Sequence, residues 1–254
     1  MSAFDLGGDV FLVTGAAGGI GRAIVAALAA AGGTVIGTDL CGEGDIVAHD
    51  VTSEADWARI AAHVAERHGR LAGLVNNAGY ALTESVEATS LEAWRRVQSI
   101  NVESMLIGLH AMLPLLRKGA EGRTGGASVV NFSSVGGLRG AAFCAAYCAS
   151  KAAVAMLTKC AAIEFAALKY GIRVNSVHPG GIETPMMDSI FRRYVALGAV
   201  PSEEAARAAT GARHPLGRLG KPEEIAGGVV YLCSPAAAFV TASELVIDGG
   251  FTSM

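Results

Sequence analysis

The sequence predicts an α/β fold: one domain whose doubly wound parallel sheet has about seven strands, with helices on both faces. Short apolar runs of strand length alternate with longer helical patterns along the whole chain. The first apolar run leads at once into a glycine-rich loop and then a helical pattern. The 254 residues are 52% hydrophobic and contain no repeat or linker, so we expect a single domain over residues 1–254.

Composition excludes several classes of protein. The net charge of −3 argues against nucleic acid or an anionic membrane as the main partner. The N-terminus has no basic region or apolar signal core, and we expect no apolar run long enough to span a bilayer. The five cysteines, at positions 41, 144, 148, 160 and 233, form no C-x-x-C pair, so no metal site and no disulfide framework is expected. These features favour a cytoplasmic protein.

The first strand is expected at Val10–Val13, and the following helix runs to about Ala31. Between them lies T-G-A-A-G-G-I-G. Glycines allow the backbone to approach a pyrophosphate, and the helix N-terminus supplies N–H donors and a positive dipole end. A merely tight turn is the alternative. The candidate cofactor-binding residues here are Gly15, Gly18, Gly19, Ile20 and Gly21.

The second strand, Thr34–Thr38, ends at Asp39. An acidic residue at this place binds the ribose hydroxyls of the adenosine and repels a 2′-phosphate. The stretch between Arg22 and Arg59 contains no Arg or Lys to receive such a phosphate. Asp39 therefore favours NAD over NADP.

A weak third strand at 45–49 leads into Asp50 and Val51, and a helix is expected to begin near Ser53. Asp50 can accept a hydrogen bond from the adenine amino group, although a plain loop Asp is the alternative. The fourth strand, 71–75, precedes a second group of cofactor candidates, Asn77, Ala78 and Gly79.

The fifth strand, 127–132, delivers Ser133 and Ser134, and the long helix at 145–170 carries Tyr147 and Lys151. These two residues are four apart and share one helix face. An ammonium group nearby lowers the pKa of a phenol, which is otherwise near 10, so Tyr147 becomes a usable general acid/base. The hydroxyl of Ser134 can then hold the substrate oxygen. A surface Tyr–Lys pair is the alternative reading of the spacing alone.

The remaining elements complete the alternation. A long helix containing Asn101 is expected at 91–116, a sixth strand at 172–177, a helix at 222–233 and a last strand at 244–247. The segment 185–215 mixes apolar and charged residues in one or two short helices, which is typical of a lid.

Six motifs in register make the chain similar to a short-chain dehydrogenase/reductase of the roughly 250-residue type. They are T-G-x-x-x-G-I-G at 14–21, N-N-A-G at 76–79, N-V at 101–102, Ser134, Y-x-x-x-K at 147–151 and P-G at 179–180. The resemblance covers about residues 10–250. It implies a Rossmann fold, a homotetramer built on the helices from Leu91 and Ala145, and a nicotinamide cofactor.

The resemblance also implies roles for individual residues. Ser134, Tyr147 and Lys151 match the family's catalytic Ser, Tyr and Lys. Asn101 matches a residue that holds a proton-relay water, and Lys151 also binds the nicotinamide ribose. The further cofactor contacts it implies are Pro179, Gly180, Ile182 and Thr184. One departure stands out: only eleven positions separate Asp39 from Asp50, so the helix usual in that segment is expected to be missing or reduced.

The expected substrate is an uncharged, apolar secondary alcohol or its ketone: an alicyclic or aromatic alcohol, or a steroid. Pro185-Met186-Met187 resembles some hydroxysteroid dehydrogenases, and Arg192 and Arg193 are expected to point outward. The expected pocket residues are apolar or small: Val135, Gly136, Leu138, Phe143, Gly181, Met186, Met187, Ile190 and Phe191. Two other functions remain open, a 3-oxoacyl thioester reductase, usually NADP-dependent, and a non-catalytic nucleotide-sensing regulator.

Overall fold

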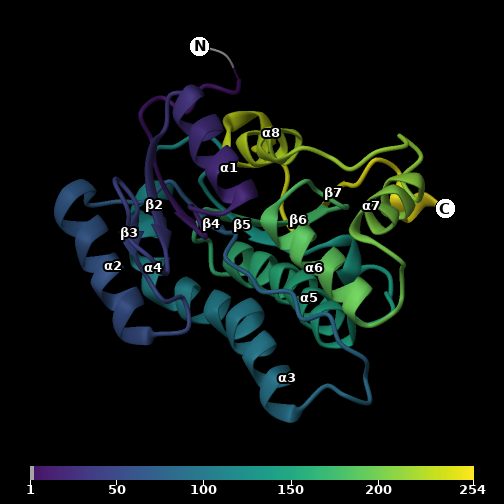
Figure 1. Cartoon of the computed structure of the whole chain (residues 1–254). Coiled ribbons are helices and arrows are strands. Elements are labelled where there is room, and N and C mark those ends of the chain that lie inside the picture. The colour runs from purple at the N-terminus through teal and green to yellow at the C-terminus, as the bar shows by residue number, and fades with distance from the viewer. Residues whose placement is uncertain (1–2) are drawn as a thin grey trace.

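Seven parallel strands form one sheet in the order β3-β2-β1-β4-β5-β6-β7 (Figure 1). The computed structural model describes residues 3–254. The strands are β1 Val10–Thr14, β2 Thr34–Asp39, β3 Val47–Ala48, β4 Gly73–Asn76, β5 Ala127–Phe132, β6 Ile172–Pro179 and β7 Glu244–Ile247. Each expected strand is confirmed. The strand order reverses between β1 and β4, and in such sheets ligands bind in the crevice at the carboxyl ends of the strands beside this point.

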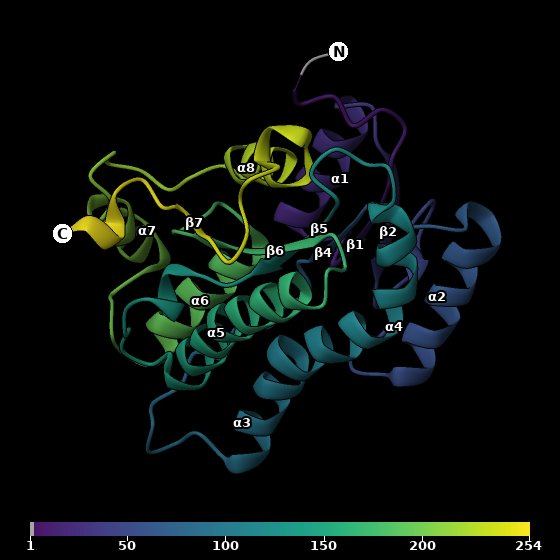
Figure 2. The same cartoon turned by 180° about the vertical axis from the view of Figure 1, so that it is seen from behind.

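Helices cover both faces of the sheet, with α1 and α8 on one side and α2, α4 and α5 on the other (Figures 1 and 2). The helices are α1 Gly19–Ala30, α2 Glu54–His68, α3 Leu91–Gln98, α4 Ser104–Ala120, α5 Ala145–Ala167, α6 Pro185–Ala196, α7 Glu203–Ala212 and α8 Pro222–Cys233. The predicted fold class is therefore confirmed.

Strand β1 shows why the central strands are apolar on both sides. Phe11 and Val13 belong to the core under α1 and α8, whereas Val10 and Leu12 belong to the core under α2, α4 and α5. Successive side chains point to opposite faces, so a strand covered on both faces needs a continuous apolar run.

The helical stretch from Leu91 to Ala120 passes through α3, a π-helical turn at Ser99–Glu103, and α4. By length and composition alone this stretch is able to cross a membrane, so the expectation that no run is long enough is wrong on that criterion. Core helices meet the same criterion. Here Met105, Met112 and Leu116 are buried in the protein interior.

No helix lies between β2 and β3. Residues 40–46 instead make a turn closed by an antiparallel bridge between Glu43 and Ile46. The missing helix is confirmed. The shortened connection brings β3 alongside the end of β2, where Asp39 pairs with Ala48.

The lid consists of α6 and α7, which share a small core of their own. Phe191 is 1% exposed and packs with Ala206 and Leu219, and the Arg207 guanidinium lies 5.6 Å from its ring centre. The expectation that Phe191 lines the substrate pocket is therefore wrong, because its ring holds the two lid helices together.

Candidate active site

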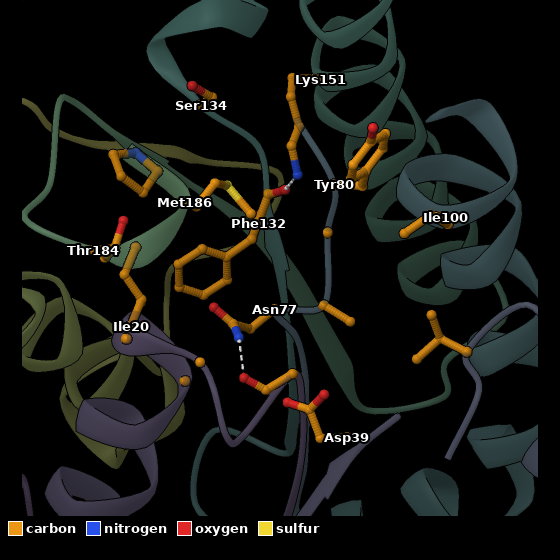
Figure 3. Close-up of a pocket in the computed structure, with 18 of the residues that line it drawn as sticks. Ile20, Asp39, Asn77, Tyr80, Ile100, Phe132, Ser134, Lys151, Thr184 and Met186 are labelled. Carbon is orange, nitrogen blue, oxygen red and sulfur yellow. Dashed lines mark hydrogen bonds between the residues drawn. The ribbon is translucent and has the colours of Figure 1, made fainter. Parts of the chain in front are cut away.

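A cavity of about 740 Å³ lies at the carboxyl ends of the strands. Its wall is built by the glycine loop, the end of β2 and the loops after β3, β4, β5 and β6 (Figure 3). Every residue expected to bind the cofactor contributes to this wall, from Gly15 in the glycine loop to Thr184. The fold thus gathers eight separate stretches of sequence at one place.

The glycine loop is shaped for close approach. Gly15 has φ +66°, and a Cβ there would lie 2.9 Å from the Cα of Ala78. A Cβ on Gly21 would overlap the carbonyl of Gly15. Helix α1 begins at the cavity, and no side chain caps its N-terminal residue Gly18. The N–H groups of its first turn are therefore available to an anion, which fits the pyrophosphate of a dinucleotide.

Asp39 stands at the end of β2 and ties the glycine loop in place. Its Oδ2 accepts a hydrogen bond from the Ala17 N–H (2.9 Å), and its Oδ1 accepts one from the Leu40 N–H (2.8 Å). Each carboxylate oxygen can accept a second hydrogen bond. The carboxylate therefore has the capacity to bind two ribose hydroxyls, as expected.

Asp50 also lines the cavity, but its Oδ1 already accepts hydrogen bonds from the N–H (2.9 Å) and the hydroxyl (2.7 Å) of Thr52. Its carboxylate therefore shapes the loop that precedes α2. Both of the alternatives given for this residue remain compatible with its place.

Asn77 joins the loop after β4 to the glycine loop. Its side-chain amide donates to the carbonyls of Thr14 and Gly15, each at 3.0 Å. Figure 3 shows one of these bonds as a dashed line. The Ala78 N–H in turn donates to the Thr14 hydroxyl at 3.1 Å. The N-N-A-G segment therefore fixes the cofactor wall as well as lining it.

Asn101 is 0% exposed and lies in the π-helical turn, behind the cavity wall. Its Oδ1 accepts from the Tyr80 N–H (2.8 Å), and its Nδ2 donates to the Tyr80 carbonyl and the Ser150 hydroxyl (both 2.9 Å). Ser150 then donates to the Tyr147 carbonyl (2.7 Å). The side-chain donors of Asn101 are all used within the protein, so a water that it holds would donate to its Oδ1 or bind its backbone.

The two serines after β5 have different tasks. Ser133 is buried and donates to the carbonyl of Lys151 at 2.7 Å, which fastens α5 to the strand end. Ser134 faces the cavity beside Tyr147, and its hydroxyl accepts from the Gly136 N–H at 3.0 Å. This geometry agrees with Ser134, and not Ser133, as the residue that meets a substrate oxygen.

Tyr147 and Lys151 share one face of α5 and both line the cavity. Burial raises the pKa of Tyr147 to about 12, against the opposing effect of its hydrogen bond with Ser134. Burial lowers the pKa of Lys151 to about 8. Lys151 Nζ donates to the Phe132 carbonyl at 2.7 Å (Figure 3). It lies 5.7 Å from the centre of the Tyr147 ring.

The expected net lowering of the Tyr147 pKa by Lys151 is therefore wrong for the site as it stands, because burial disfavours the charged phenolate and raises the pKa. At neutral pH the phenol is protonated and the lysine is charged. The pair is poised to donate a proton, and it reaches the phenolate form only at alkaline pH.

Among the expected substrate residues, Met186, at the start of α6, is the one that lines the cavity. Gly136 lies beside Tyr147, where an added Cβ would be 3.4 Å from the ring. The remaining apolar residues do not line it: Val135, Leu138, Phe143, Met187 and Ile190. Gly181 instead borders a smaller cavity beside His214. The hydroxyl of Thr184 accepts from the Met187 N–H at 3.2 Å as the N-cap of α6.

Arg193 does not simply point outward, contrary to expectation. It forms an ion pair with Glu84, in the loop after β4, and its Nε donates to the Thr83 carbonyl at 3.3 Å. The neighbouring Tyr194 lies against the loop before α5, with its hydroxyl 3.6 Å from Cys144 Sγ. The lid is thus bound to the loop after β4 and to the loop before α5.

Sequence reasoning missed several residues of the cavity wall. Tyr80 follows the N-N-A-G motif directly, and Arg96 and Ile100 precede Asn101 by five positions and one position. Their closeness in sequence to these motifs could have predicted their place in the cavity wall. The sequence around His49 offers no such indication, because its place depends on the packing of β3 against α2.

The comparisons with known proteins agree with this site. A family model described as enoyl-(acyl carrier protein) reductase matches residues 15–252. The NADP-dependent (R)-specific alcohol dehydrogenase of Lentilactobacillus kefiri is 36% identical, with 98% of each chain covered. The cyclopentanol dehydrogenase of Comamonas sp. is 39% identical over 96% of this chain and 97% of that protein. The 3-beta-hydroxysteroid dehydrogenase of Comamonas testosteroni is 38% identical, with 98% of each chain covered.

Solved structures agree as well. The ligand-free aldohexose dehydrogenase of Thermoplasma acidophilum superposes with a TM-score of 0.87 at 32% identity, over 97% of this chain and 94% of that one. Its match extends over nearly the whole chain, as do those of the three relatives. The family of these relatives binds a nicotinamide cofactor. The chain belongs to the short-chain dehydrogenase/reductase family.

Proposed function

We propose that this protein is an NAD-dependent dehydrogenase that interconverts an apolar secondary alcohol and its ketone. The observation that carries the proposal is the meeting of Ser134, Tyr147 and Lys151 at one end of a cavity whose other end is closed by Asp39. A proton-transfer group, a donor for the substrate oxygen and a dinucleotide wall are then in one place.

The chemistry divides between the cofactor and the protein. A bound nicotinamide supplies the redox step, because it accepts hydride from the carbinol carbon in oxidation and returns it in reduction. Tyr147 takes the proton of the substrate hydroxyl in oxidation and gives it back in reduction. Ser134 hydrogen-bonds the same oxygen, and the charge of Lys151 stabilises the phenolate as it forms.

The preference for NAD rests on Asp39 and on the lack of an Arg or Lys in the sequence between Arg22 and Arg59. A 2′-phosphate at this place would meet the carboxylate that already binds the Ala17 and Leu40 N–H groups. The relative from L. kefiri is NADP-dependent, which makes the cofactor a direct test. We expect Asp39→Ala to reduce the NAD-over-NADP ratio of kcat/KM by about tenfold or more, the loss of one charged hydrogen-bonding group. An unchanged ratio would remove the role given to Asp39.

An apolar substrate is supported by Met186 on the cavity wall. Relatives named for cyclopentanol and 3-beta-hydroxysteroid point the same way. The test is NADH formation with a panel of cyclic, aromatic and steroidal alcohols. A panel of 3-hydroxyacyl thioesters with NADP tests the alternative, a 3-oxoacyl thioester reductase. A nucleotide-sensing regulator would turn over neither panel.

We also propose a homotetramer located in the cytoplasm. Helices α4 and α5 leave several large apolar side chains on their outer faces, namely Leu106 (45% exposed), Met156 (59%) and Ile163 (67%). Such a patch is typical of a subunit interface. Light scattering of the purified protein measures the assembly directly, and a monomer at micromolar concentration would exclude it.

A further inference from the structure

His178 is a titratable side chain that the proposed reaction leaves unused. It lies in β6, directly before the Pro179-Gly180 segment of the cavity wall, and it is 0% exposed. Burial lowers its pKa, so the imidazole is neutral at pH 7. A buried polar ring with defined partners on both nitrogens needs an explanation, since an apolar residue would pack there at lower cost.

Its two hydrogen bonds fix one tautomer. Nδ1 lies 3.1 Å from the carbonyl oxygen of Ser134, and Nε2 lies 2.9 Å from the Ser176 hydroxyl. A carbonyl only accepts, so Nδ1 carries the proton and donates to Ser134. Nε2 then accepts from the hydroxyl of Ser176. The ring thus connects β6 to the residue that follows β5.

Ser134 is held at both ends. Its hydroxyl accepts from the Gly136 N–H (3.0 Å), and its carbonyl accepts from the Gly137 N–H (2.9 Å) and from His178. Two of these three donors belong to the loop that begins at Ser134, whereas His178 comes from a strand of the sheet. His178 is therefore the side chain that connects the Ser134 carbonyl to the sheet.

We propose that His178 is a positioning residue for the reaction: by donating to the Ser134 carbonyl, it sets the place of the Ser134 hydroxyl beside Tyr147. This inference rests on the proposed function, in which that hydroxyl holds the substrate oxygen. A misplacement of about 1 Å at such a group costs about 10²-fold in rate. The loss of a single buried hydrogen bond can therefore have a large effect on the rate.

Two amide substitutions separate the two nitrogens. In His178→Asn the side-chain amide reaches the position of Nδ1 and keeps a donor for Ser134. In His178→Gln the amide reaches the position of Nε2 and keeps the contact with Ser176. We expect His178→Asn to retain kcat within about threefold and His178→Gln to lose about tenfold or more, with NADH affinity unchanged in both. Equal losses in the two variants would overturn the inference.

A double-mutant cycle tests the route of the effect. If His178 acts through the Ser134 hydroxyl, His178→Gln has little further effect on kcat in a Ser134→Ala background. A full additional loss there would mean that His178 acts by another route. The thermal midpoint of each variant is measured alongside. Should His178→Gln fail to fold, Ser176→Ala replaces it: this change removes the partner of Nε2 and leaves the Nδ1 donor to Ser134. We then expect kcat within about threefold of the wild type, and a loss of about tenfold or more would overturn the inference.

Amide hydrogen exchange tests this inference without relying on enzyme activity, so its outcome can be distinguished from that of the proposed function. Amides of residues 134–140 are expected to exchange faster in His178→Gln than in His178→Asn, whether or not an alcohol is turned over. If the wild type turns over none of the alcohols but the exchange difference is present, the proposed function fails and the structural link stands. If exchange is the same in both variants, His178 does not hold Ser134.

Discussion

The phenol of Tyr147 and the ammonium of Lys151 are both forced toward their neutral forms by burial. The pKa of Tyr147 is raised to about 12 and that of Lys151 is lowered to about 8. Oxidation needs the phenolate, whose fraction rises tenfold per pH unit below the pKa, whereas reduction needs the protonated phenol. Above about pH 8 Lys151 loses its charge and no longer stabilises the phenolate.

We therefore predict that kcat/KM for alcohol oxidation rises between pH 6 and 8 and levels off above it. The same ratio for ketone reduction stays flat between pH 6 and 8. Initial rates in both directions measure this, with Tyr147→Phe as the control that removes the titrating group. That variant should lose about 10²- to 10⁴-fold in turnover and still bind NADH. An oxidation profile that is flat from pH 6 to 9 would contradict the assignment of Tyr147.

At the scale of elements, helix α6 is held over the cavity by contacts beyond its own core. Arg193 connects it to Glu84 and Thr83, and Glu84 is itself bound through its N–H to the Phe143 carbonyl (2.7 Å). Cys144, next in the chain, is the N-cap of α5, which carries Tyr147. The loop at Glu84 therefore joins the lid to the start of the catalytic helix.

We predict that Arg193→Ala loosens the lid. The ion pair is partly exposed, and together with the hydrogen bond to Thr83 we expect about a three- to tenfold rise in KM for the alcohol. Amides of residues 185–196 should exchange faster, while NADH affinity changes little. Arg192→Ala is the matched control, because Arg192 is exposed and makes no ion pair or hydrogen bond with any part of the chain that the structure describes. The same KM in both variants would exclude the lid contact.

At the scale of the whole molecule, the strands and the cofactor wall were predictable because their signals are local. An apolar run such as the one containing Leu12 must be buried on both faces, and Gly15 and Asp39 occupy places set by a strand end. The site of Phe191 was not predictable, since it depends on how α6 packs against α7. The pKa of Tyr147 was also mispredicted, because burial depends on the whole fold.

His49 connects the stability of the whole molecule to pH. It is 1% exposed, its Nδ1 lies 3.0 Å from the Thr38 hydroxyl, and its ring meets the Trp57 ring edge-on at 4.4 Å. Its Nε2 has no hydrogen-bond partner in the described part of the chain. Burial lowers the pKa of His49 to about 4, so a proton on this ring would be poorly solvated in the folded state.

The sign of the effect on stability follows from the pH at which His49 becomes protonated in the unfolded and in the folded state. Unfolded chains protonate His49 below pH 6.5, whereas the folded protein does so only below about pH 4. Between these values the unfolded state holds more protons, so stability falls as the pH falls, by about 3 kcal/mol over the whole interval. Urea unfolding of the wild type and of His49→Gln, at several pH values from 4 to 7, measures this contribution. We predict that the stability of the variant declines less steeply, because its neutral amide replaces the imidazole. Parallel curves for the two proteins would show that His49 is not the group that links folding to pH.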